Sequence, residues 1–321
     1  MSKAHPHEDE KCPLSEFASR LEKAVERLDK PVRFRAKNAF LHLHQAWRLR
    51  HLDQGMAAFR AITAEEEAAT ALIISLKRKG YPNADRLNAR NHDHKSSIFF
   101  LMQVISGILA KVGHTPRVYL VDKDDPPRFY IEMDIQKLAG SESIEPYFIQ
   151  PVLPLDFTIS DDSGTKTFAS EFAEFASERG YVRARDYLKA QANLRNRILY
   201  AADNGIPKVE IPDEFILHRK ERIAAILSIV IMIEQTQEVQ SFAVQSLHAL
   251  LQILEKLEND VPLPIKARPP QEVCLQIERT LHASRIGIVK DGKTFTADFE
   301  YARSTEFYTT WLDSWTIKGR F

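Results

Sequence analysis

Residues 58–113 decide the fold of this chain, reading AFRAITAEEEAATALIISLKRKGYP to Pro82 and then NADRLNARNHDHKSSIFFLMQVISGILAKVG. Apolar residues recur at helical spacing in both parts, at Ala68, Ala71, Leu72 and Leu76 and then at Ile98, Leu101, Met102, Ile105, Ile108 and Leu109. Gly80 and Pro82 end the first helix, because glycine adopts the left-handed conformation after a last turn and proline prevents continuation. The stretch predicts two helices joined by a short polar connection, with the second helix at the centre of the protein.

The first of these helices is predicted to start at Thr63. Thr63 and Glu66 have the spacing of a capping box, in which each side chain accepts a hydrogen bond from the other residue's backbone N–H. Glu65, Glu66 and Glu67 then lie in the first turn, where the helix dipole favours negative charge. The alternative is that one glutamate turns inward to a metal ion or to a catalytic arginine or histidine.

Charge is distributed unevenly along the chain. The 321 residues contain 44 Lys and Arg against 44 Asp and Glu, so no global field indicates a nucleic acid or a membrane. Residues 31–115, however, contain 13 basic against 6 acidic residues, with six histidines besides. This basic segment indicates an anionic partner, which is either a protein or a nucleic acid such as RNA.

Other classes of protein are disfavoured. Two cysteines in unlike contexts, Cys12 and Cys274, indicate a reducing compartment, and the polar N-terminus is no signal peptide. The longest apolar run, residues 224–233, is too short to span a bilayer. With 11 glycines there is no phosphate-binding loop, so we expect a cytoplasmic protein with no cofactor and no membrane partner.

Strand-like runs follow the helical hairpin, so we predict an α+β fold that is predominantly a helical bundle. Strands inserted at 116–160 form a small antiparallel sheet within a helical domain of residues 14–260, preceded by a disordered tail at 1–13. Residues 261–321 form a proline-rich linker and a β-hairpin module, which packs on or beside the same domain. The hairpin reads RIGIVK-DG-KTFTADFEY, because Asp291-Gly292 suits a type I′ turn.

Further helices are expected around that sheet. One is expected to end before Pro31, the next to start near Ala36, and the two helices after Pro212 to pair as an antiparallel hairpin. Residues 32–52 interleave basic and aromatic side chains, and the candidate nucleic-acid-binding residues are Arg33, Arg35, Lys37, Arg48 and Arg50. The alternative places the aromatic residues Phe40 and Trp47 in the core, with the arginines outside.

Candidate catalytic residues lie in RLNARNHDH, where Arg86 and His92 are separated by five residues and Arg90 is a second arginine. This spacing resembles the HEPN family of helical domains over residues 55–113. The resemblance implies metal-independent RNA cleavage, usually across a dimer. In that chemistry His92 moves a proton, and Arg86 or Arg90 holds the phosphate. In place of the family's polar residue after the arginine, this chain has Leu87.

Metal binding is a third hypothesis. His-x-His pairs occur at His5/His7, His42/His44 and His92/His94, but two residues apart on a helix point about 200° apart and cannot share an ion. A site combining the third pair with Glu66 stays open, and we predict no metal ligands.

We therefore predict a non-enzymatic helical interaction protein that binds its partner through residues 31–115. The alternative is a HEPN-like endoribonuclease or abortive-infection-type effector, the third hypothesis is a metal-dependent hydrolase, and homo-oligomerisation stays open.

Overall fold

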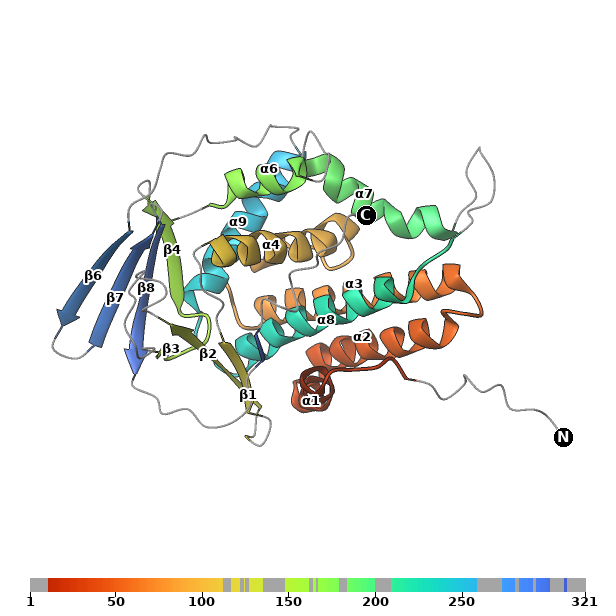
Figure 1. Cartoon of the computed structure of the whole chain (residues 1–321), viewed down its shortest axis with the longest axis horizontal. Helices are drawn as coiled ribbons and strands as arrows, with labels where there is room; N and C mark the ends of the chain where they lie inside the picture. Colours follow the sequence, from red (N-terminus) through yellow and green to blue (C-terminus); the bar gives the residue numbers. More distant parts are fainter. Residues whose placement is uncertain are drawn as a thin grey trace.

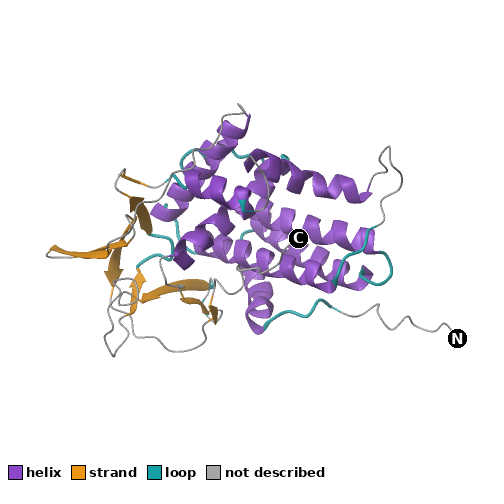
Figure 2. Cartoon of the chain, turned by 45° about the horizontal axis from the view of Figure 1, so that its top comes forward, coloured by secondary structure: helices purple, strands orange, loops and turns teal. Residues whose placement is uncertain are grey.

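The structure is a computed structural model. It describes residues 11–111, 117–121, 124, 127–134, 148–161, 164–165, 167–178, 184–199, 209–258, 273–280, 283–290, 293–300 and 309–310. The strands gather at one end of a helical bundle, so the fold is α+β and predominantly helical, as predicted (Figure 1). The same separation of helices from strands is visible after the molecule is turned (Figure 2).

The described helices come in two groups along the chain. The N-terminal group is α1 (Glu16–Ala24), α2 (Lys30–Leu49), α3 (Gln54–Arg78) and α4 (His92–Lys111), with 3₁₀ turns η1 (Val25–Arg27) and η2 (Ala84–Arg86). The second group is α6 (Ala169–Ser177), α7 (Ala184–Leu199), α8 (Asp213–Glu234) and α9 (Ser241–Glu258).

Helix α3 is the centre of the bundle and packs against α2, α4, α7 and α8. Its buried alanines are Ala57, Ala58, Ala61, Ala64, Ala68, Ala69 and Ala71. Side chains this small let the neighbouring helices approach closely, and a helix with apolar residues on most sides is buried. The following helix, α4, was predicted to be central, and it also packs against four helices, α3, α6, α7 and α9.

The predicted start of α3, at Thr63, was wrong. The helix begins after Asp53, whose Oδ1 accepts a hydrogen bond from the Met56 N–H at 2.9 Å. Thr63 lies in the middle of the helix, where its hydroxyl donates to the Phe59 carbonyl at 2.8 Å. The alanines before Thr63 favour helix strongly enough to extend it upstream, so the capping-box pattern has no function here.

Two further helix predictions need correction. Helix α2 starts at Lys30 instead of Ala36, because Pro31 fits the first turn of a helix, where its missing N–H costs nothing. Helix α9 packs on α4 and on a strand instead of pairing along the length of α8.

The described strands form one antiparallel sheet. They are β1 (Arg117–Val121), β2 (Arg128–Asp134), β3 (Phe148–Pro151), β4 (Phe157–Asp161), β5 (Gly164–Thr165), β6 (Val273–Thr280), β7 (Ala283–Lys290), β8 (Lys293–Glu300) and β9 (Thr309–Thr310). The order is β5-β4-β8-β3-β2-β1-β9, with β7 and then β6 pairing beyond β8. The predicted hairpin of β7 and β8 is present in register, with Lys290 opposite Lys293. Strand β8 also pairs with β3 and β4, so the C-terminal module joins the inserted sheet.

Glutamine side chains attach the helices to the sheet. Gln245 of α9 accepts from the Ile159 N–H at 2.9 Å and donates to the Ile159 carbonyl. Gln235, after α8, makes the same pair of bonds to Phe129 of β2, at 2.7 and 3.1 Å. Each amide therefore satisfies both backbone groups of a strand residue, as a neighbouring strand would.

Residues 11–15 precede α1, and Cys12 among them belongs to the hydrophobic core. Cys12 is 3% exposed, although residues 1–13 were predicted as a disordered tail. Residues 1–10, the predicted linker at 261–272, the turn at 291–292 and residues 311–321 lie outside the described residues. In the described part of the chain, every helix is too short or too polar to cross a membrane.

Candidate functional site

Helix α2 has two faces of opposite character. The buried face contains Val32, Ala36, Ala39, Phe40, Leu43, Ala46 and Trp47. Phe40 and Trp47 are therefore core residues, 2% and 7% exposed. The other face repeats at three- and four-residue spacing and contains basic and amide side chains that are exposed or partly exposed. Two apolar side chains also lie on this outer face, Phe34 at 61% exposed and Leu41 at 53%.

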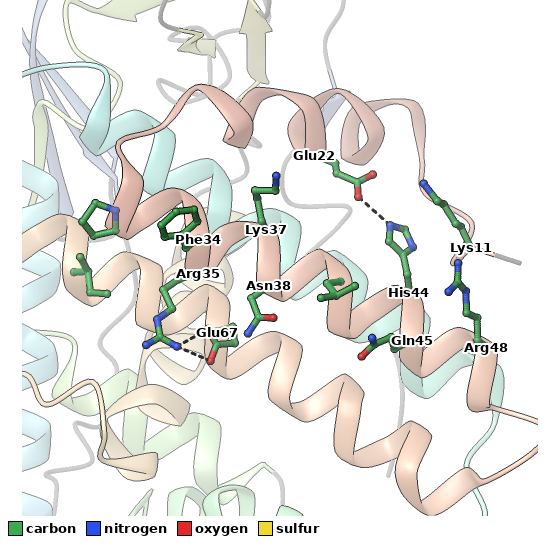
Figure 3. Close-up of a pocket in the computed structure, with 13 residues that line it drawn as sticks. Lys11, Glu22, Phe34, Arg35, Lys37, Asn38, His44, Gln45, Arg48 and Glu67 are labelled. Atoms are coloured by element: carbon green, nitrogen blue, oxygen red, sulfur yellow. Dashed lines mark hydrogen bonds and ion pairs between the residues drawn. The ribbon is translucent and has the colours of Figure 1, made fainter. Parts of the chain in front are cut away.

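The outer face of α2 forms one wall of an open groove of about 830 Å³, which we name the α2 groove (Figure 3). Its lining residues are Lys11, Glu22, Pro31, Phe34, Arg35, Lys37, Asn38, Leu41, His44, Gln45, Arg48, Glu67 and Ile74. They come from the segment before α1, from α1, from α2 and from α3. Binding sites for small ligands and chain segments have volumes of this order.

The α2 groove carries excess positive charge, with four basic side chains against two carboxylates. Arg35 binds Glu67 across the groove floor, with its Nη1 3.1 Å from each carboxylate oxygen. Lys37 reaches Glu26 at 2.7 Å, and both side chains are about half exposed. The Nε of Arg48 is buried and has no hydrogen-bond partner among the described residues. Ion pairs near the surface, such as Arg35–Glu67 and Lys37–Glu26, are weak, so an anionic ligand can replace these carboxylates as the partner of Arg35 and Lys37.

His44 fixes the upper edge of the α2 groove. Its Nδ1 accepts from the Cys12 N–H at 3.2 Å, and its Nε2 lies 3.0 Å from Glu22 Oε1 (Figure 3). Because a backbone N–H can only donate, Nδ1 is the acceptor and Nε2 carries the proton. The hydrogen bond from His44 lowers the pKa of Glu22. Burial raises the pKa of the Cys12 thiol to about 12, so this cysteine is no nucleophile.

The structure brings together some of the predicted nucleic-acid-binding residues. Those that line the α2 groove are Arg35, Lys37 and Arg48. Arg33 lies beside it, with its guanidinium 5.7 Å from the centre of the Phe34 ring. Arg50 lies elsewhere: it is 8% exposed, stacks on Trp47 at 4.0 Å and pairs with Asp213 at 3.6 Å. Burial therefore removes Arg50 from any contact with a partner.

The three glutamates of α3 point to different helices. Successive residues of a helix project about 100° apart, so one triplet can reach three neighbours. Glu67 faces Arg35 of α2 and the groove. Glu65 faces α8, where Arg219 and Arg222 lie 3.7 and 3.4 Å from its Oε2. The predicted role of the triplet in compensating the dipole of an N-terminal turn was wrong, because all three lie in mid-helix.

Glu66 is the hub of a second polar cluster, formed with His92, Lys95 and Arg195. His92 Nδ1 lies 2.7 Å from Glu66 Oε1, and Lys95 Nζ lies 3.0 Å from Oε2. Arg195 of α7 approaches the same Oε2 at 3.7 Å and stacks over Phe59 at 4.7 Å. The His92 side chain is 44% exposed, whereas that of Lys95 is 10% exposed. The cluster therefore presents an oriented imidazole to solvent.

The predicted arginine partners of His92 have other neighbours. Arg86 pairs with Glu255 of α9 at 3.6 Å, and His92 pairs with Glu66 of α3. The Arg90 side chain is exposed, and its backbone N–H donates to Asn88 Oδ1. Arg86 and His92 are thus paired with carboxylates that lie on two different helices.

The two His-x-His pairs among the described residues, His42/His44 and His92/His94, are separated as well. On α2, His42 accepts from Arg60 of α3 at 3.0 Å while His44 faces α1. Burial, with the charge of Arg60, lowers the pKa of His42. His94 is buried, and its Nδ1 accepts from the Asn88 N–H, so that nitrogen is occupied. Among the described residues, no three His, Cys, Asp or Glu side chains converge on one point.

Several features of these sites were not predicted from the sequence. Phe34 was not singled out, although its position on the outer face of α2 follows from the helical period once the core face is known. No sequence signal connects Arg195 with Glu66, which are 129 residues apart. Comparison with family models, with curated proteins and with solved structures gives no match for this chain.

Proposed function

We propose that this is a non-enzymatic nucleic-acid-binding protein of the cytoplasm, and that its partner is a single strand lying in the α2 groove. The observation that carries the proposal is the coincidence of three kinds of side chain in one groove. Basic groups, exposed apolar groups and amide groups lie together along α2. A groove that follows a phosphate backbone and offers a surface for base stacking needs these groups.

The dimensions of the groove favour an extended chain. From Pro31 to Arg48 the outer face of α2 is about 25 Å long, so several consecutive phosphates can lie along it. Arg35, Lys37 and Arg48 supply the positive charge along this length. Phe34 is exposed at one end with Arg33 beside its ring, which offers a base a face on which to stack. A duplex keeps its bases stacked internally, so a stacking residue selects for single strands.

The test is fluorescence anisotropy with a labelled single-stranded RNA of about twelve nucleotides, compared with a duplex of equal length. The variants are Lys37→Glu, which reverses a groove charge, and Phe34→Ala. The matched control is Lys189→Glu, which makes the same charge change at an exposed position of α7 outside the groove.

We expect the single strand to bind more tightly than the duplex, and its affinity to fall with salt with a logarithmic slope of about −2 to −3. Phe34→Ala should weaken binding by about tenfold, the effect of losing one stacked base. The proposal fails if Lys37→Glu and Lys189→Glu behave alike, or if no oligonucleotide binds. An acidic protein segment would then be the remaining kind of partner.

The alternative function, a HEPN-like ribonuclease, receives less support. The HEPN resemblance requires Arg86 or Arg90 beside His92, but Arg86 pairs with Glu255. For this reason we favour binding in the α2 groove over cleavage by that pair of residues.

A further inference from the structure

The two ends of the α2 groove differ in how their basic side chains are paired. Arg35 and Lys37 each have a carboxylate partner, at 3.1 and 2.7 Å. Lys11 and Arg48 form neither an ion pair nor a side-chain hydrogen bond in the described part of the chain. We propose that Lys11 and Arg48 bind the terminal phosphate of the strand, so that the partner is a single strand with a phosphorylated end. This inference rests on the function proposed above and specifies its ligand.

One hydrogen bond brings the two cations to the same end of the groove. The Cys12 N–H donates to His44 Nδ1, which places Lys11, the preceding residue, against α2. Arg48 follows His44 by four residues, so it lies one turn further on the same face of the helix. Both side chains line the groove at this end (Figure 3). Phe34, the residue proposed for base stacking, lies about 21 Å away along α2.

Compensation of the helix dipole accounts for only one of these cations. Arg48 lies in the last turn of α2, where positive charge stabilises a helix. Lys11 belongs to the segment before α1, so the dipole of α2 does not explain its place beside the same groove. A guanidinium and an ammonium group that meet from separate segments, with no carboxylate between them and no acceptor of their own, are arranged to receive an anion.

The number of unpaired cations favours a phosphate monoester over an internal phosphodiester. An internal phosphodiester carries one negative charge, whereas a monoester carries about −1.5 to −2 at pH 7 and offers three acceptor oxygens. Glu22 opposes an anion at this end: the hydrogen bond from His44 lowers the pKa of Glu22, and the charge of Lys11 lowers it further, so the carboxylate is ionised. A second charge on the ligand therefore needs both Lys11 and Arg48.

The experiment is competition fluorescence anisotropy with the full chain and an internally labelled single-stranded RNA of about twelve nucleotides. The competitors are unlabelled strands of the same sequence with a 5′-phosphate, with a 3′-phosphate, or with hydroxyls at both ends. One phosphorylated strand should bind about tenfold more tightly than the hydroxyl strand, the effect of one added set of charged hydrogen bonds. The preferred end gives the direction of the strand. Methyl esterification of that phosphate, which leaves it one charge, should remove most of the preference.

Variants of the groove test which side chains produce the preference, measured as the ratio of the two affinities. Arg48→Gln and Lys11→Gln should each lower the ratio to about two or less. Lys37→Gln is the matched control: it removes the same charge from the groove and should weaken both strands while leaving the ratio unchanged. Glu22→Gln should raise the ratio, because its amide oxygen still accepts from His44 while the opposing charge is lost. Thermal melting shows whether each variant is folded.

The outcomes separate this inference from the function on which it rests. If phosphorylated and hydroxyl strands bind the wild-type chain equally, the inference is overturned and binding in the α2 groove stands. The inference is also overturned if Arg48→Gln and Lys37→Gln change the ratio alike, since the phosphate would then have no defined place. If no strand binds, with or without a terminal phosphate, the proposed function fails and this inference fails with it.

Discussion

Arg219 and Arg222 bring two guanidinium groups to one carboxylate, Glu65, between α3 and α8. Arg219 is 7% exposed and stacks on Phe215 at 3.8 Å, and Arg222 stacks on Phe99 at 4.0 Å. Burial lowers the pKa of Arg219 to about 10, although the charge of Glu65 opposes this. The Nε atoms of both arginines lack hydrogen-bond partners among the described residues. Glu65 is therefore the counterion that both guanidinium groups share.

The first prediction concerns that residue. Glu65→Gln should lower the free energy of unfolding by about 3 kcal/mol, because it leaves one buried and one largely buried cation without their shared counterion. Glu26→Gln is the matched control: it removes the exposed carboxylate bound to Lys37 and should cost no more than about 0.5 kcal/mol. Urea unfolding at constant m-value measures both. Equal costs would contradict the structural role of Glu65.

At the scale of the element, α3 shows how an internal sequence pattern can imitate a helix start. The helix is capped ten residues before Thr63, by Asp53. Asp53→Ala should therefore destabilise the protein by about 1 kcal/mol. Thr63→Ala should leave the stability nearly unchanged. Alanine is the better helix former, and the Thr63 hydroxyl donates only to the Phe59 carbonyl of the same helix.

Thermal and urea denaturation of these two variants measure the difference. If Thr63→Ala were the more damaging substitution, α3 would begin where the capping box indicated. The two substitutions are a fair comparison because each removes one side-chain hydrogen bond to the same helix.

At the scale of the whole molecule, the sheet depends on side chains of the bundle. Ile159 is fully buried, and its backbone N–H and carbonyl both bond to Gln245. Gln245→Leu should cost about 3 kcal/mol, because two buried backbone groups lose their partners. Hydrogen exchange at the Ile159 amide should accelerate, while the Phe129 amide, held by Gln235, should stay protected.

The control for this prediction is Gln252→Leu, on an exposed position of the same helix. It should leave both the stability and the exchange rates near the wild-type values. Similar effects of Gln245→Leu and Gln252→Leu would show that the contact between α9 and β4 does not depend on the amide.

Much of the fold was predictable because local signals were consistent. Helical periodicity placed α4, α6, α7, α8 and α9, and β-rich runs placed most of the strands, including the hairpin of β7 and β8. The basic outer face of α2 was likewise readable from its residue types. Helix starts were less reliable: the alanines extended α3 upstream of Thr63, and α2 starts at Lys30, with Pro31 in its first turn, instead of near Ala36.

The sequence alone determined the fold class, the positions of most elements and the charge of α2, because each depends on residues close together along the chain. The tertiary structure decided how the helices pack around α3, which arginines are buried and what surrounds His92. Those outcomes depend on contacts between residues far apart in the sequence, such as Glu66 and Arg195, which are separated by 129 residues. The geometry of such a meeting is set by how closely the alanines of α3 let its neighbours pack, and no local pattern encodes it.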